Sequence, residues 1–228
     1  MTELKTQNEK PLQTLLLIAV VPIYLSVIAL HWEVIQEMAV SRSWLAWSQL
    51  AAIGAGPVIC LKVILALLVN IVDTRWKERL VHLRWHNPLP GSRSDKLLLK
   101  DARIDQDNLP PQVKTLLDDS LTARQRNALW YNNVYRPVRM TPAISNTHRR
   151  YLLHREAATG VFVVFSCSIL VDAASRIAFQ VPIMTAPGYL ALFVYLALLI
   201  WAANQAGNRM VTGAIANFTS AKSDGGAQ

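Results

Sequence analysis

Four stretches of this chain stay apolar for about twenty residues each, and this constrains the fold more than any other feature. They cover residues 12–32, 50–72, 158–180 and 188–207. Because a helix needs about 20 mostly apolar residues to cross a hydrocarbon core roughly 30 Å thick, each stretch predicts a transmembrane helix. A soluble protein with four buried helices is disfavoured, since about 85 residues of polar chain could not cover helices that are hydrophobic all round.

The charged residues are concentrated between spans two and three. From Asp73 to Glu156 there are 16 Lys and Arg against 9 Asp and Glu, a local net charge of +7 in a chain whose total is +8. Lysine and arginine accumulate on the cytoplasmic side of membrane proteins, so we expect this region and both termini inside the cell. The predicted fold class is therefore all-α, an integral membrane protein with four transmembrane helices and a small helical cytoplasmic domain inserted between spans two and three.

This topology divides the chain into nine predicted segments. They are a cytoplasmic tail (1–11), span one (12–32), a periplasmic loop (33–49), span two (50–72), a basic helical cytoplasmic domain (73–157), span three (158–180), a second periplasmic loop (181–187), span four (188–207) and a cytoplasmic tail (208–228).

The basic domain reads as short helices separated by turns. Pro110 and Pro111 predict a helix start, and Thr122 predicts the N-cap of a helix that runs to about Tyr135 and is stopped by Pro137. Pro142 is expected in the loop that follows, and a helix is expected to begin after Ser145 and to run without interruption into span three. A small core is predicted from Leu97, Leu98, Leu116, Leu117, Leu121, Leu129, Val134 and Leu152. Such a core is thin for an independent domain, so we expect support from the adjoining spans and from self-association into a homo-oligomer.

Three charged residues fall inside predicted spans, namely Lys62, Asp172 and Arg176. A charge at membrane depth costs roughly 2.5–3.5 kcal/mol on insertion scales, so it usually faces protein or water. The depths of Lys62 and Asp172 in antiparallel spans allow them to pair. Three interpretations stay open: an ion pair that fixes helix packing, an intramembrane polar seam that lines a pore or a subunit contact, and a proton relay.

Small residues at spacings of four predict close helix packing or a hinge. The candidates are Ala52, Gly54, Gly56 and Pro57 in span two, and Ala203 and Gly207 in span four. Ordinary packing within the chain and an oligomer contact both remain compatible with this pattern.

Motifs for catalysis and metal binding are weak. His82 and His86 lie four residues apart, but without cysteines or clustered carboxylates they make a poor metal site. The chain has no G-x-x-x-x-G-K, G-x-S-x-G, H-E-x-x-H or C-x-x-C motif. We therefore expect no enzyme activity, no cofactor and no metal, and the lipid bilayer is the first predicted partner.

Aromatic residues interleaved with arginines predict a cytoplasmic recognition surface. This pattern suits contact with bases and phosphates, while core packing of the aromatics and arginine contact with anionic lipid explain it equally well. The candidate recognition residues are Trp85, His86, Asn87, Arg93, Arg126, Trp130, Tyr131, Tyr135, Arg136, Arg149 and Arg150.

Three runs in this domain carry a resemblance to a known family. Residues 83–93 (LRWHNPLPGSR), 130–137 (WYNNVYRP) and 148–155 (HRRYLLHR) resemble small bacterial membrane proteins of antiphage islands, in particular the transmembrane effector of retron defence systems. The resemblance implies a toxin-like protein of the bacterial inner membrane that acts in abortive infection. It also implies control by a reverse transcriptase and its RNA–DNA product, contacting the cytoplasmic domain.

Two other classes of function stay open on the sequence alone. One is a non-toxic membrane anchor or regulatory subunit that recruits a soluble partner, and the other is a small oligomeric transporter or membrane enzyme.

Overall fold

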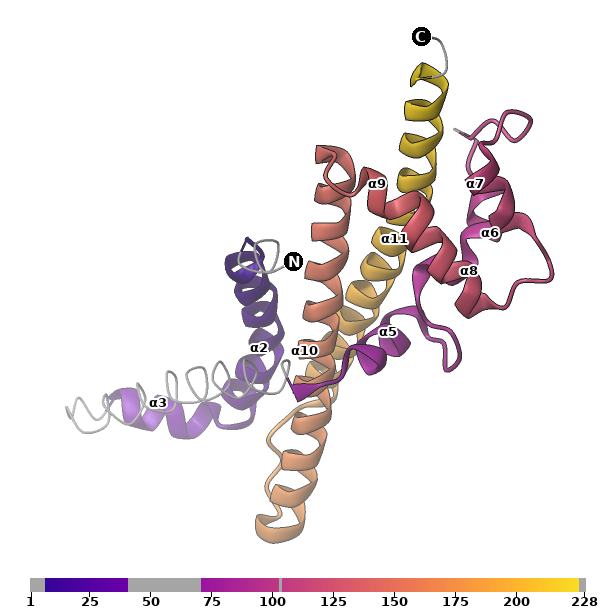
Figure 1. Ribbon diagram of the computed structural model, residues 1–228. Coiled ribbons are helices and arrows are strands. Elements are labelled where there is room, and N and C mark those ends of the chain that lie inside the picture. The colour runs from indigo at the N-terminus through magenta and orange to yellow at the C-terminus, as the bar shows by residue number, and fades with distance from the viewer. Residues whose placement is uncertain (1–6, 41–70, 103, 226–228) are drawn as a thin grey trace. The chain divides into compact units, whose positions relative to one another are not determined.

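The structure is a computed structural model that describes residues 7–40, 71–102 and 104–225. Every regular element in these ranges is a helix and none is a strand, so the all-α prediction is confirmed for the described residues (Figure 1). Predicted span two lies outside the described residues apart from its last two positions. Lys62 and the small residues Ala52, Gly54, Gly56 and Pro57 also lie outside the described residues.

The helices follow one another in this order along the chain. They are α2 (Glu9–Leu30), α3 (Trp32–Val40), α5 (Thr74–His82), η1 (Pro90–Arg93), α6 (Ser94–Leu98), α7 (Pro111–Lys114), η2 (Thr115–Leu117), α8 (Ala123–Leu129), η3 (Trp130–Tyr135), α9 (Arg136–Val138), α10 (Pro142–Phe179) and α11 (Ala186–Gly225).

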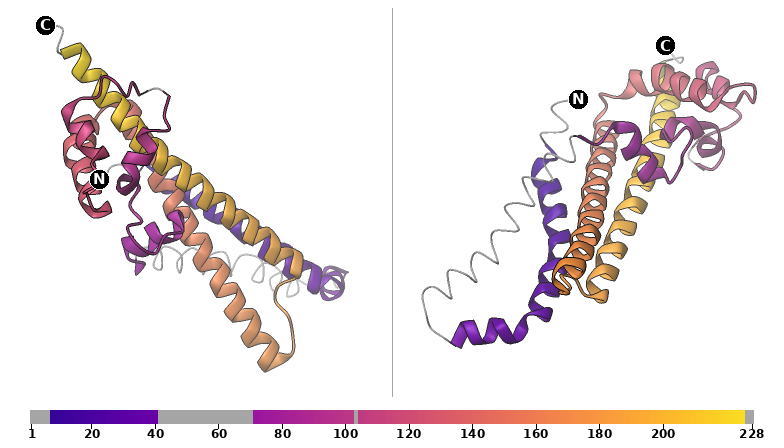
Figure 2. Two further views of the ribbon diagram at one scale, coloured as in Figure 1. Left: turned by 90° about the vertical axis from the view of Figure 1, so that its right-hand side faces the viewer. Right: turned by 90° about the horizontal axis from the view of Figure 1, so that it is seen from below.

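The chain forms two compact units, which we call the basic unit and the apolar unit. The basic unit combines residues 1–8, 74–155 and 200–228, and the apolar unit combines residues 9–73 and 156–199. Helices α10 and α11 each contribute one part to either unit, and both are unbroken along their length (Figures 1 and 2).

Three of the described helices are long and apolar enough to cross a membrane: α2, α10 and α11 as far as Lys222. In the apolar unit, large hydrophobic side chains point outward, for example Leu25 at 61% exposure, Leu170 at 68% and Leu190 at 63%. Outward apolar faces of this length are typical of helices solvated by lipid, so the structure indicates a membrane protein.

The apolar unit is held together by a few polar contacts between its helices. The Tyr195 hydroxyl donates to the Leu15 carbonyl at 2.9 Å, and the Ser26 and Thr185 hydroxyls share a hydrogen bond of 2.9 Å. Phe165 packs edge-on against Tyr189, which joins α10 to α11. Interhelical hydrogen bonds of this kind stabilise helix association in lipid, where apolar surface alone provides no preference.

Two helices extend well beyond the predicted spans. Helix α10 begins at Pro142 and runs without interruption into predicted span three, so the helix expected after Ser145 is confirmed and starts a few residues earlier. Helix α11 continues to Gly225, past the end of predicted span four. The loop expected around Pro142 is therefore wrong. Proline is well suited to the first turn of a helix, where its missing N–H has no partner to bond.

In the basic unit, the core combines buried residues of the short helices α5 to α9 with buried apolar residues from the parts of α10 and α11 that belong to this unit. Leu98, Leu116, Val134 and Leu152 are buried as predicted, whereas the other four predicted core leucines are half-buried. Trp130 and Tyr135 are also buried, in agreement with the core-packing interpretation of the aromatics. The buried apolar residues of this unit that the prediction omitted are Val81, Ile104, Leu109, Val113, Val138, Ile144, Tyr151, Ala203, Ala206, Met210, Val211, Ala214, Ile215 and Phe218.

The predicted caps in this unit are partly confirmed. Pro111 begins α7, and Thr122 forms a capping box with Gln125 at the start of α8. The expectation that Pro137 stops this helix is wrong, since the chain passes through a π-helical turn at 130–135 and continues to Val138. Pro137 has no N–H to donate. Just before it, the Arg136 N–H bonds to the Tyr131 carbonyl five residues earlier, instead of the carbonyl four residues earlier as in an α-helix.

Candidate functional site: a buried polar network beside an arginine-lined cleft

The site begins where α5 ends at His82. Leu83 has a positive φ of 49°, and the Arg84 N–H bonds back to the Arg79 carbonyl at 3.2 Å. This is the hydrogen-bond pattern of a Schellman cap, in which one left-handed residue ends a helix. Because a side chain at positive φ is strained, Leu83 holds the turn at some cost. The turn leads the chain away from the α5 axis directly after His82.

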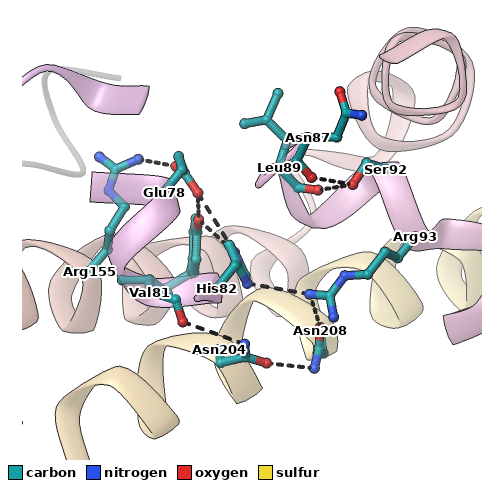
Figure 3. A network of polar contacts seen from close by, with 11 residues as sticks. Glu78, Val81, His82, Asn87, Leu89, Ser92, Arg93, Arg155, Asn204 and Asn208 are labelled. Atoms are coloured by element: carbon teal, nitrogen blue, oxygen red, sulfur yellow. Dashed lines mark hydrogen bonds and ion pairs between the residues drawn. The ribbon is translucent and has the colours of Figure 1, made fainter. Parts of the chain in front are cut away.

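A buried carboxylate, Glu78, forms the centre of a polar network (Figure 3). The Arg155 guanidinium donates to Glu78 Oε1 at 2.7 Å, and the Tyr151 hydroxyl donates a short hydrogen bond to Glu78 Oε2. Glu78 is 3% exposed and Arg155 is 8% exposed, so the ion pair is removed from water. A buried carboxylate is tolerated only when its charge and its lone pairs are satisfied in this way.

His82 extends the network from Glu78 toward Arg93. Its Nε2 lies 3.3 Å from the Tyr151 hydroxyl and 3.7 Å from Glu78 Oε2, while Arg93 Nη2 lies 3.4 Å from its Nδ1. Since arginine can only donate, Nδ1 must accept and the proton of the neutral ring must sit on Nε2. Burial, followed by the charges of Arg93, Arg84 and Arg155, lowers the pKa of His82 from 6.5 to about 3. The imidazole is therefore neutral at physiological pH.

Asparagines of α11 complete the network. Arg93 also donates to Asn208 Oδ1 at 3.3 Å, Asn208 donates to Asn204 Oδ1 at 3.1 Å, and Asn204 donates to the Val81 carbonyl at 3.5 Å (Figure 3). Each member thus bonds to a residue of a different segment. The network joins α5, η1, the first half of α10 and the middle of α11.

Gly207 of α11 permits the close packing of these groups. A Cβ placed on Gly207 would lie 3.1 Å from His82 Cε1 and 3.1 Å from Tyr151 Cε2. The two rings are stacked, with centroids 6.0 Å apart at an interplanar angle of 28°. A larger residue at this position would require the ring pair to shift by a few tenths of an ångström. Ala203, one turn earlier on the same helix, is fully buried.

A cleft of about 430 Å³ opens beside the network. Its walls come from α5, from the turn after α5 and from the start of α8. The lining residues are Thr74, Arg75, Glu78, Arg79, Trp85, His86, Asn87, Pro88, Leu89, Ser92, Ala123, Arg124 and Asn127.

Arg79 is held against two tryptophans at this cleft. Its guanidinium carbon lies 4.9 Å from the centre of the Trp76 ring and 5.1 Å from that of Trp85. The two indoles meet edge to face with centroids 5.4 Å apart. Cation–π contacts of this kind fix the orientation of an arginine without neutralising its charge.

The predicted recognition residues fall into four groups. Trp85, His86 and Asn87 line the cleft, and Arg93 belongs to the polar network. Other predicted residues serve the core: Arg126 bonds the Leu116 and Asp118 carbonyls, Trp130 is 3% exposed, and Tyr135 bonds His148 at 2.6 Å. Tyr131 stacks on Tyr135, Arg149 contacts Gln7 and Asn8, and Arg136 and Arg150 are exposed.

The predicted intramembrane seam is only partly described, because Lys62 lies outside the described residues. Asp172 binds Arg176 Nε at 2.8 Å and accepts the backbone N–H groups of Ile183 at 2.6 Å and Met184 at 3.1 Å. Its carboxylate therefore organises the connection between α10 and α11. Arg176 is exposed over about half of its side chain.

Glu78, Tyr151 and Arg155 were absent from the predicted site residues. The sequence held a usable signal, since Glu78 and His82 stand four residues apart, as do Tyr151 and Arg155, and each pair shares one helix face. His86 does not share a helix with His82, because α5 ends at His82. Across the described ranges, no group of three or more His, Cys, Asp or Glu side chains is placed to hold a metal ion.

The two features suit different tasks. The network is closed, with its charges engaged inside the protein, so it can hold segments in register and can release them if it breaks. The cleft is open and cationic, so it can receive an anionic group from outside. Comparison of the chain with models of known protein families, with curated proteins and with solved structures gives no match.

Proposed function

We propose that this chain is an inner-membrane effector of an antiphage defence system of the retron type, which permeabilises the membrane when its cytoplasmic partners release it. The observation that carries the proposal is the buried network around Glu78. It joins α5 to the parts of α10 and α11 that belong to the basic unit, and both helices then continue as apolar segments. A change in the basic unit would thus act on the helices that meet lipid.

The energetics of the network favour a two-state device. Removing one partner from a buried ion pair typically costs about 3–5 kcal/mol, because the remaining charge is left without compensation. A network of this kind is either closed or open, with few stable states between. A partner shifts such an equilibrium only by its difference in affinity for the two states. In the proposed system, a reverse transcriptase with its RNA–DNA product binds the basic unit in the closed state and holds the effector silent.

The test is depolarisation of the cytoplasmic membrane in cells that express the full chain. With its genomic neighbours present, we expect a stable membrane potential until phage infection, and loss of the potential afterwards. Glu78→Gln removes the carboxylate charge that Arg155 Nη1 contacts at 2.7 Å and should cause depolarisation before infection. Asp119→Asn removes an exposed carboxylate from the same unit and is the matched control. Membrane levels of each variant are compared by immunoblot.

Two outcomes would contradict the proposal. One is an intact membrane potential in infected cells that contain the complete system. The other is depolarisation that is the same for the parent chain, Glu78→Gln and Asp119→Asn, since the network would then have no part in control.

The arginine-lined cleft favours a second function, that of a non-toxic membrane anchor that recruits a soluble partner. This function predicts that the full chain in membranes retains the product of a neighbouring gene, that expression alone leaves the membrane potential unchanged, and that Glu78→Gln causes no depolarisation.

A further inference from the structure

The cleft beside α5 has an excess of positive charge that the protein itself does not neutralise. Arg75, Arg79 and Arg124 line it, and the one carboxylate in its wall, Glu78, is already bonded to Arg155 and Tyr151. Within the described ranges, neither Arg75 nor Arg124 forms an ion pair, and Arg79 Nε is buried without a hydrogen-bond partner. An anion is the ligand that this lining requires, and arginine is the side chain best shaped for phosphate.

The charge of the lining also distinguishes between kinds of phosphate ester. A zwitterionic headgroup carries an ammonium, which the three arginines of the lining repel. Glu78 is engaged, and Arg79 already lies against the Trp76 and Trp85 rings. The cleft therefore favours a ligand with net negative charge.

The position of the cleft in the chain identifies the source of that phosphate. Arg75 follows the end of predicted span two, at residue 72, by only three residues. Residues 72 and 73 are not helical, so these three residues cover at most about 11 Å, which places the arginine close to the depth of the lipid headgroups. Trp76 and Trp85 are 51% and 65% exposed, and tryptophan is enriched at that same depth. The volume of about 430 Å³ lies within the usual range for small-ligand sites.

We propose that this cleft binds the phosphate headgroup of an anionic phospholipid from the inner leaflet, with Arg75 and Arg124 as the phosphate ligands and Arg79 fixed by the two tryptophans. The proposal depends on predicted span two and on the predicted cytoplasmic side of the basic unit, and not on the role of the chain as an effector. It would hold equally for a toxin or for an anchor.

The experiment measures lipid binding by the full chain in a neutral detergent. Isothermal titration calorimetry compares dihexanoyl phosphatidylglycerol with dihexanoyl phosphatidylcholine, and glycerol 3-phosphate and AMP serve as water-soluble phosphate esters. The double variant Arg75→Gln with Arg124→Gln tests the cleft. The double variant Arg136→Gln with Arg150→Gln removes the same charge from exposed positions that do not line it.

We expect phosphatidylglycerol to bind in preference to phosphatidylcholine, glycerol 3-phosphate and AMP. An arginine near an anionic membrane surface contributes about a fivefold factor, so the cleft variant should weaken this binding at least about tenfold. The control variant should bind within about twofold of the parent. Because Arg75 and Arg124 are exposed, equal melting temperatures should show that both variants are folded.

Equal affinity for the two lipids would overturn the proposal, as would equal losses in the two double variants. Tighter binding of AMP or glycerol 3-phosphate than of phosphatidylglycerol would assign the cleft to a soluble phosphate ester instead. If the cleft variant is less stable than the parent, the single variant Arg124→Gln replaces it, with Arg136→Gln as its control and at least a threefold weakening expected.

Discussion

The neutral state of His82 predicts a stability loss in mild acid that can be calculated. In the folded protein the pKa of His82 is about 3, whereas an unfolded histidine has a pKa of about 6.5. As the pH falls below 6.5, the unfolded chain takes up a proton that the folded chain cannot accept. The contribution of His82 to stability is therefore complete above about pH 6.5 and is lost progressively toward pH 3.

At pH 5 the loss amounts to about 2 kcal/mol relative to pH 7.5. This value is insensitive to the folded pKa, because at pH 5 the folded ring is almost wholly neutral whether its pKa is 3 or 4. For a chain of this size, about 2 kcal/mol corresponds to a melting temperature lower by about 4–8 °C. The groups around the ring are Glu78, Tyr151 and three arginines, so the positive charges outweigh the one carboxylate.

The assay is thermal unfolding of the detergent-solubilised full chain at pH 7.5 and pH 5.0, followed by circular dichroism. Other groups titrate in this range, so His82→Gln is measured alongside the parent, and the difference between the two isolates His82. The variant should lose about 4–8 °C less than the parent between the two pH values. His86→Gln, which removes an exposed imidazole from the same region, should follow the parent profile. If parent and His82→Gln lose the same amount, the reasoning about a buried neutral ring is refuted.

Three substitutions test the local geometry of the basic unit by the same unfolding measurement. Leu83→Gly should stabilise the protein by about 1 kcal/mol, because φ at this position is 49°, and Leu83→Ala should give no such gain. Gly207→Ala should be less stable than Gly213→Ala on the same helix by about 1–3 kcal/mol, because the added Cβ would have its nearest neighbour at 3.1 Å at position 207 but at 3.5 Å at position 213. Equal stabilities would show that the rings beside Gly207 move aside without cost. Gly91→Ala should cost about 1–3 kcal/mol or more, because the added Cβ would overlap the Trp130 ring, and a neutral result would exclude that packing.

The apolar stretches of the sequence predicted three of the candidate membrane helices, because a helix solvated by lipid needs about 20 mostly apolar residues in a row. Spans one, three and four correspond to α2, α10 and α11. What hydropathy could not predict is that α10 starts at Pro142 and that α11 runs to Gly225. Polar residues extend a helix as readily as apolar ones when packing supports it. The hydropathy profile therefore locates the apolar part of a helix but not the residues at which the helix begins and ends.

The site was harder to predict because tertiary contacts, and not local patterns, define it. Thr122 could be placed at an N-cap since a capping box is local. Glu78 and Arg155 are 77 residues apart, and only the fold reveals that they meet. Among the candidate recognition residues, Trp85 and His86 are exposed at the cleft whereas Trp130 and Arg126 are buried, and the sequence alone could not separate the two pairs.

The Asp172 contacts have a consequence for how the protein enters the bilayer. This carboxylate accepts hydrogen bonds from the N–H groups of Ile183 and Met184. Two backbone donors of the turn between α10 and α11 are therefore satisfied within the protein. An amide that carries no hydrogen bond opposes transfer through hydrocarbon by several kcal/mol. With those amides covered and Arg176 paired to the same carboxylate, the two helices can partition together as a prefolded hairpin. Biogenesis would then need to translocate one compact turn and no extended polar loop.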